Sequence, residues 1–165
     1  MFAQLDTKSV YSFMDSVVDL NSYVARAKEL GYQALGLMDR DNLYAAYHFA
    51  QIASRHGLHP LIGMEANLFY EGRKIPFRLL AKNNQGYKNL MKLATELSSG
   101  QREFTAFSDY LNDIALILPS EDWEPGMTLG SEVFIGVRPE DAGKEFDYPV
   151  VPLHTVRYFE NADRS

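Results

Sequence analysis

Short apolar runs alternate along this chain with segments of helical periodicity, and that order restricts the fold more than any other feature. Compact apolar runs occupy residues 34–38 and 114–118, and both are typical of buried strands. Around them, apolar residues recur every three or four positions, which indicates amphipathic helices. Strands that alternate with helices favour an α/β fold, with layered strands and helices outside.

The element boundaries follow from local signals. We expect helices over residues 20–30 and 43–56, each followed by a glycine that ends it. A third helix should begin after the capping groups at residues 83–86. Its predicted apolar face comprises Tyr87, Leu90, Met91, Ala94 and Leu97. Further strands are expected at residues 2–6, 61–70, 75–81, 133–137 and 150–153. The polar link at residues 71–74 predicts a hairpin.

Composition limits the classes of function. The 165 residues allow one domain with a real core, and 46% hydrophobic content is ordinary for a globular protein. No cysteine is present, which excludes disulfides and thiolate zinc sites and is consistent with a cytoplasmic protein. The net charge of −6 argues against a strong grip on DNA. No apolar run approaches the ~18 residues of a membrane span, so no membrane partner is expected.

Five segments carry a resemblance to a known family. They read FAQLDTKSVYSFMD at residues 2–15, LMDRDNL at 37–43, IGME at 62–65, LLAKNNQGYKNL at 79–90 and VVPLHTVRYF at 150–159. In order and context these segments resemble the PHP domain at the N-terminus of the bacterial DNA polymerase III alpha subunit, a replicative C-family polymerase. The resemblance implies an irregular, distorted TIM-like PHP barrel, in a truncated or shortened version.

Metal-binding PHP domains hold divalent ions with histidines and carboxylates at strand ends. The resemblance places these ligand positions on ten residues here: Asp6, Lys8, Asp15, Asp39, Arg40, Glu65, Pro76, Pro119, Thr155 and Arg157. Lysine and arginine offer no lone pair at neutral pH, and a proline side chain has no donor atom. We therefore expect a degenerate site without metal and without catalytic residues.

The replacements suggest what took the place of the ions. Among the ten positions, Asp6, Asp39 and Glu65 are acidic, and Lys8, Arg40 and Arg157 are basic. We hypothesise that salt bridges among them replace the metal ions, because clustered carboxylates without a cation would repel each other.

Plainer interpretations stand beside this one. Without the resemblance, Asp39 and Glu65 are ordinary strand-end carboxylates, and Lys8 and Arg40 are solvated charges. His48 and His56 lie eight residues apart, which is not the spacing of a helical zinc site. His154 lies near the degenerate site as a further possible ligand.

The resemblance implies a function for the parent protein. Residues 1–165 would be a PHP domain fragment without the polymerase core, and residues 159–165 would be the start of a helix cut short. The parent subunit would be a DNA-directed DNA polymerase, a nucleotidyltransferase that uses Mg²⁺. This domain would be non-catalytic and would serve as a scaffold or docking part.

The implied partners are the rest of the subunit, a proofreading exonuclease, and DNA through the parent protein. Two alternatives stay open. One is an active metal-dependent phosphoesterase or 3′–5′ exonuclease, and the other is a free-standing interaction module.

Overall fold

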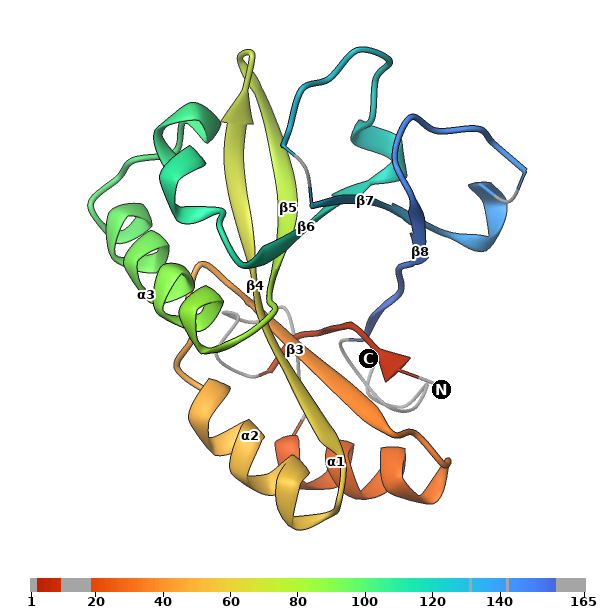
Figure 1. The fold of residues 1–165 in the computed structure, drawn as a ribbon. Coiled ribbons are helices and arrows are strands. Elements are labelled where there is room, and N and C mark those ends of the chain that lie inside the picture. Colours follow the sequence, from red (N-terminus) through yellow and green to blue (C-terminus); the bar gives the residue numbers. More distant parts are fainter. Residues whose placement is uncertain (1–2, 10–18, 131, 142, 157–165) are drawn as a thin grey trace, which may run out of the picture. The chain divides into compact units, whose positions relative to one another are not determined.

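The computed structural model describes residues 3–9, 19–130, 132–141 and 143–156 (Figure 1). The chain divides into two compact units. Unit 1 comprises Met1–Met64 with His154–Ser165, and unit 2 comprises Glu65–Leu153. A single domain over the whole chain stays a prediction, and each unit is described by itself. The helix start expected at residues 159–165 lies outside the described residues.

Unit 1 is built on β3 (Ala34–Arg40), which is buried along almost its whole length. β1 (Ala3–Gln4) pairs with β3 in parallel, and β4 (His59–Tyr70) begins on the other side of β3. A separate small sheet joins β2 (Asp6–Thr7) in parallel to β9 (Thr155–Val156). The apolar run at residues 34–38 is therefore a strand, as predicted.

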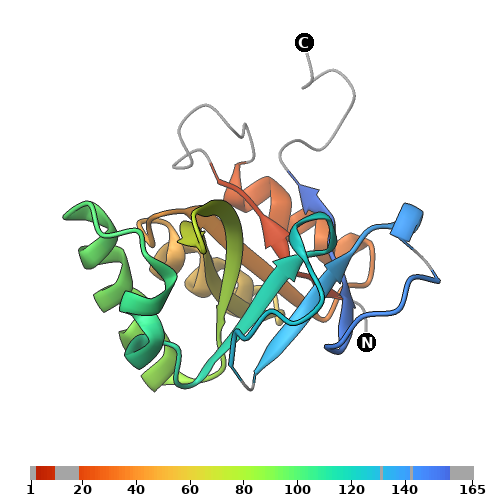
Figure 2. The ribbon, with the colours of Figure 1, turned by 90° about the horizontal axis from the view of Figure 1, so that it is seen from above.

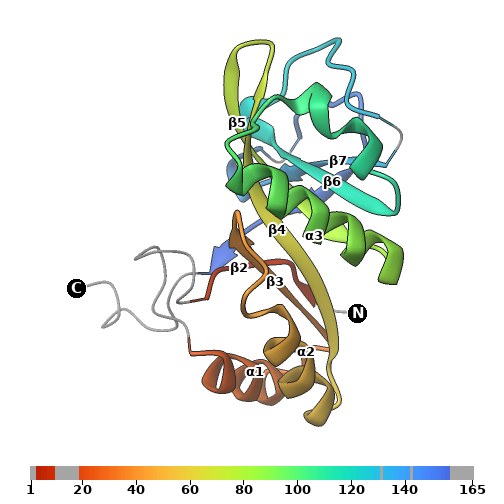
Figure 3. The same ribbon diagram turned by 90° about the vertical axis from the view of Figure 1, so that its left-hand side faces the viewer.

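Two helices cover the sheet of unit 1. α1 (Leu20–Glu29) and α2 (Ala46–Arg55) lie side by side (Figure 3) and share a core with β3. That core contains Leu20, Tyr23, Val24, Ala27, Leu35, Leu37, Phe49, Ile52 and Ala53. Asp19 caps α1 by accepting a hydrogen bond from the Ser22 amide, and Gly31 follows the helix with a φ of 81°. Both helices occur where helical periodicity predicts them.

Unit 2 holds the second half of β4 and four further strands. β4 turns into β5 (Arg73–Ala81) at Glu71 and Gly72, both with positive φ, which matches a tight hairpin turn. β5 pairs antiparallel with β6 (Ile114–Pro119), and β6 pairs in parallel with β7 (Val133–Val137). Figure 2 shows β6 and β7 running side by side, and β8 (Val150–Pro152) extends the sheet beyond β7. The predicted hairpin is confirmed.

α3 (Asn84–Ser98) packs against β5, with a short 3₁₀ segment, η1 (Phe104–Tyr110), beside it. Asn83 caps α3 by accepting a hydrogen bond from the Gly86 amide at 2.9 Å, as the capping pattern predicts. Its buried face includes Leu90, Leu93 and Leu97, whereas Met91 is 44% exposed. The predicted apolar face is therefore confirmed at Leu90 and Leu97 and wrong at Met91, while Leu93 is buried instead.

Two short 3₁₀ turns, η2 (Ser120–Asp122) and η3 (Pro139–Asp141), follow β6 and β7. Among the described residues, no helix is long and apolar enough to cross a bilayer. The mixed order of strands and helices confirms the α/β class.

Candidate functional site

Unit 1 contains a buried ion pair between the Lys8 ammonium and the Asp6 carboxylate. Both side chains are fully shielded from solvent. The Thr155 hydroxyl donates to the other Asp6 oxygen at 2.5 Å, so each oxygen of this carboxylate receives a donor. Asp6 lies opposite Thr155 in the β2–β9 pairing, which explains why residues 149 positions apart meet.

Lys8 directly follows β2, and the alternation of side chains along a strand places residues two apart on the same face, so Lys8 lies beside Asp6. Lys8 is among the largest fully buried side chains of the described residues. An unpaired ammonium at this depth would carry a desolvation penalty of several kcal/mol. The pairing with Asp6 is therefore a condition for placing lysine here.

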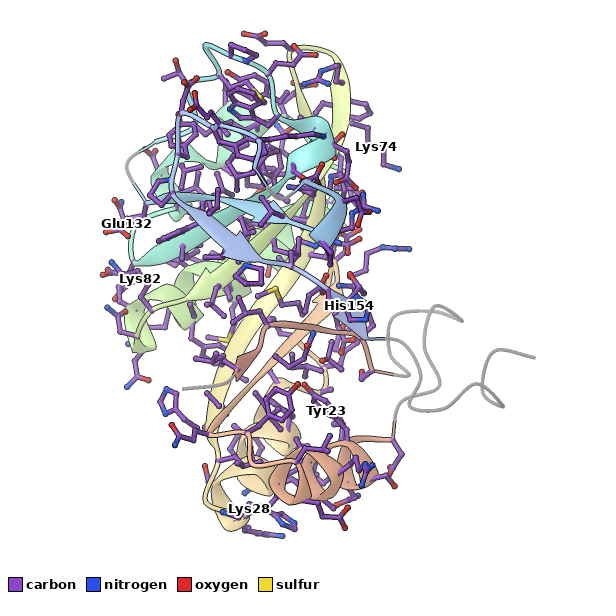
Figure 4. All side chains as sticks on the ribbon, turned by 90° about the vertical axis from the view of Figure 1, so that its right-hand side faces the viewer. Tyr23, Lys28, Lys74, Lys82, Glu132 and His154 are labelled. Carbon is purple, nitrogen blue, oxygen red and sulfur yellow. The ribbon has the colours of Figure 1, made fainter. Side chains whose placement is uncertain are left out.

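Thr7 lies between the two charged residues, and its side chain points away from them into a short chain of hydrogen bonds. Its hydroxyl donates to the Tyr23 phenol oxygen at 2.7 Å, and Tyr23 donates to the Gly36 carbonyl at 3.5 Å. Figure 4 labels Tyr23, which reaches from α1 toward the strands of unit 1. Burial raises the pKa of Tyr23, with the hydrogen bond from Thr7 acting in the opposite direction. Tyr23 is thus held as a neutral phenol that ties α1 to β2 and β3.

Asp39, near the end of β3, is also buried and occupied by donors. One of its oxygens accepts from the Ser9 amide and the other from the Ser9 hydroxyl, each at 2.6 Å. Arg40 follows at the strand end and is half-buried, and its carbonyl accepts from the Asn42 side chain at 2.8 Å. The structure therefore joins Asp39 to the segment that carries Asp6 and Lys8.

Glu65 and Pro76 belong to unit 2, where Arg78 connects them. The Glu65 carboxylate is 3.5 Å from the Arg78 guanidinium, and both side chains are largely buried. Arg78 also donates to the Pro76 carbonyl at 2.8 Å. Sequence reasoning missed Arg78, although alternation along β5 puts residues 76 and 78 on one face.

Pro119 ends β6 in a buried position opposite Gly136 of β7. The next residue, Ser120, donates to the Asp141 carboxylate at 2.5 Å, and Lys144 donates to it at 2.6 Å. The hydrogen bonds from Lys144 and then Ser120 lower the pKa of Asp141 to about 2. No motif in the sequence pointed to this cluster, because Ser120 lies 21 residues before Asp141 in the chain.

Asp15 and Arg157 lie outside the described residues. Within the part of the chain that is described, no group of three or more His, Asp and Glu side chains is placed to hold a metal ion. His48, His56, His59 and His154 are all exposed. Of the positions that the resemblance gave, Lys8 supplies an ammonium, and Pro76 and Pro119 supply no side-chain donor. These residues do not fit a cluster of divalent ions.

The chain belongs to the PHP domain family, whose model matches residues 4–124. This confirms the family that the five sequence segments indicated.

Curated relatives of this chain include bacterial DNA polymerases. The DNA polymerase III subunit alpha of Streptococcus pyogenes serotype M1 is 44% identical over 165 residues, covering 99% of this chain and 16% of the relative. The DNA polymerase III subunit alpha of Bacillus subtilis (strain 168) is 33% identical over 126 residues, covering 73% of this chain and 11% of the relative. The chain therefore spans about one sixth of the length of the Streptococcus pyogenes relative.

One solved structure gives a weaker likeness. An amidohydrolase from Chromobacterium violaceum, solved with bound sulfate and no metal, is 19% identical with a TM-score of 0.49. The match covers 59% of this chain and 34% of that chain.

Proposed function

We propose that this chain is the PHP part of a bacterial replicative DNA polymerase, non-catalytic itself, and that buried ion pairs stabilise it where related domains hold metal ions. The parent subunit would extend DNA primers with Mg²⁺ at a site outside this chain. The chain would act in the cytoplasm, with the rest of the subunit as its first partner and an exonuclease and DNA as further ones.

One observation carries the proposal: the fully buried pair of Lys8 and Asp6. An ammonium has three donors and no lone pair, so it cannot bind a cation and repels one nearby. Metal binding to Asp6 would have to displace both the Lys8 and the Thr155 donors. Lys8 thus supplies the positive charge that a metal ion would otherwise bring to this carboxylate.

Asp39 and Glu65 support the same interpretation. Each of these carboxylates is buried: Asp39 accepts two hydrogen bonds from Ser9, and Glu65 lies 3.5 Å from the Arg78 guanidinium. The positive charge that balances the Glu65 carboxylate thus comes from Arg78, which is not one of the ten ligand positions. A non-catalytic role follows if no metal can enter.

The decisive experiment is metal analysis of the purified chain, expressed in medium supplemented with zinc, manganese and iron. We expect substoichiometric metal and no metal-stimulated hydrolysis of a phosphodiester substrate such as bis(p-nitrophenyl) phosphate. A matched variant with Asp6→His, Lys8→His and Arg40→His restores imidazoles and serves as the comparison.

Stoichiometric metal in the unmodified chain, together with metal-dependent hydrolysis, would instead establish the alternative of an active phosphoesterase or 3′–5′ exonuclease. Stoichiometric metal without hydrolysis would refute only the proposal that ion pairs take the place of the metal ions.

A further inference from the structure

Unit 2 contains a cavity of about 690 Å³ that the ion-pair centre does not use. The tip of the β4–β5 hairpin, η1, the start of β6 and the segment that leads into β7 form its walls. Pockets of about 300–1,000 Å³ are the usual size for ligand sites. Asp6, Lys8 and Asp39 do not line this cavity, so a ligand bound there is independent of the proposed function.

Aromatic side chains give the cavity an apolar surface. Phe69, Tyr70 and Phe104 line it, and Tyr70 meets Phe104 edge to face with ring centroids 5.5 Å apart. Phe104 is buried and packs onto Phe77, whereas Phe69 is 37% exposed. A large aromatic ring left open in a concave surface is a common feature of protein docking sites.

Backbone hydrogen bonds hold these walls in place. The Phe69 amide donates to the Arg102 carbonyl at 2.7 Å, and Phe69 forms a parallel bridge with Glu103. The Thr128 amide donates to the Tyr70 hydroxyl oxygen at 3.1 Å. Because regular hydrogen bonds join three separate segments, the cavity is formed before a ligand arrives, which lowers the entropic cost of binding.

The rim of the cavity is acidic. Four carboxylates line it, from Glu71, Glu103, Asp113 and Glu132, and Lys82 is the one basic side chain among the described lining residues. One ammonium against four carboxylates leaves a net charge of −3. Lys82 is paired with Glu132 at 3.0 Å, and the two are seen side by side in Figure 4. The remaining three carboxylates favour a cationic ligand.

We propose that this cavity is a docking site for a basic segment of a partner protein, which inserts an apolar or aromatic side chain against Phe69 and places lysines or arginines at the acidic rim. Charge complementarity selects this occupant. A nucleic acid would be repelled by the rim, and a second copy of this chain carries a net charge of −6. Arginine and tryptophan are the side chains that most often dominate such contacts.

The test uses the 165-residue chain and a fluorescein-labelled dodecapeptide with one central tryptophan flanked by arginines and lysines. Anisotropy titrations should show saturable binding that weakens as salt is raised. Replacing the tryptophan with serine, or the basic residues with glutamate, should abolish binding.

Variants of the chain locate the site. Phe69→Ser should raise the Kd about 30-fold, as for a central anchor. Glu103→Lys, an exposed charge reversal that leaves the fold intact, should raise it about fivefold. The matched control Glu145→Lys, exposed and outside the cavity lining, should change the Kd by less than about twofold. Circular dichroism confirms that each variant is folded.

Equal Kd values for Glu103→Lys and Glu145→Lys would overturn the assignment, as would the absence of binding or a preference for the glutamate peptide. None of these three results bears on metal content, so a failure of this proposal is distinguishable from a failure of the proposed function.

Discussion

At the scale of single residues, the buried ammonium of Lys8 is the main energetic feature of unit 1. This ammonium is fully buried and pairs with Asp6, so removal of either partner leaves the other charge without this counterion in a low-dielectric interior. We expect Lys8→Met, which keeps the length and apolar body of the side chain, to lower the free energy of unfolding by about 3–5 kcal/mol. Urea denaturation measures this change.

The exposed pair of Arg26 and Glu29 provides the control, because both side chains are more than half exposed. Arg26→Ala should cost less than about 1 kcal/mol. The double variant Asp6→Asn with Lys8→Met should recover part of the loss, since it leaves no uncompensated charge. A cost for Lys8→Met no larger than that of Arg26→Ala would show that the pair does not stabilise unit 1.

Asp141 makes part of the stability depend on pH. Hydrogen bonds from Lys144 and Ser120 hold its folded-state pKa at about 2, below the ordinary value of 3.8. The stabilisation is therefore present above the ordinary value and is lost as the pH falls toward 2. We expect the stability advantage of the unmodified chain over Asp141→Asn to be constant above about pH 5 and to shrink below about pH 4.

Denaturation of both proteins at a series of pH values measures that difference. Other carboxylates titrate in both proteins, so only the difference reports on Asp141. A gap that stays the same down to pH 2 would contradict the assignment.

At the scale of elements, Gly36 determines how closely β3 approaches the strand that carries Asp6. A Cβ atom at this position would lie 2.0 Å from the Leu5 carbonyl oxygen and 2.8 Å from the Leu5 Cα, and backbone atoms yield only if a strand moves. Gly36→Ala should therefore cost about 3 kcal/mol, measured by urea denaturation, and should disturb the segment that leads into Asp6.

Gly100→Ala separates this clash from the general effect of losing a glycine. Gly100 has a φ of 97° and no heavy atom within 4 Å of its added Cβ, so its replacement adds only backbone strain of about 1–2 kcal/mol. Similar losses of unfolding free energy for the two variants would mean that the close approach of Gly36 to Leu5 does not limit how β3 packs.

The elements also show where sequence reasoning succeeds and where it stops. Helical spacing located α3, and the side chain of Asn83 caps it as expected. The same spacing assigned Met91 to the buried face, but Met91 is exposed and Leu93 is buried. A helix of mixed apolar character permits two neighbouring stripes, and only contact with β5 selects one of them.

At the scale of the whole molecule, charge predicts behaviour toward DNA. The net charge of −6 opposes association with a phosphate backbone. We expect the isolated chain to show no saturable binding to a fluorescein-labelled single-stranded oligonucleotide at physiological salt. Anisotropy measures this, and tight binding that weakens steeply with added salt would reveal a basic surface that the net charge conceals.

The sequence by itself determined the kind and order of the main elements, and it predicts the loss of metal-binding side chains, because both follow from local periodicity and residue type. Only the tertiary structure decided that Lys8 is fully buried, that Thr155 completes the Asp6 site and that Arg78 balances Glu65. These partners belong to strands whose pairing register is a long-range property. Burial, and with it the strength of each charge interaction, exists only once those strands have met.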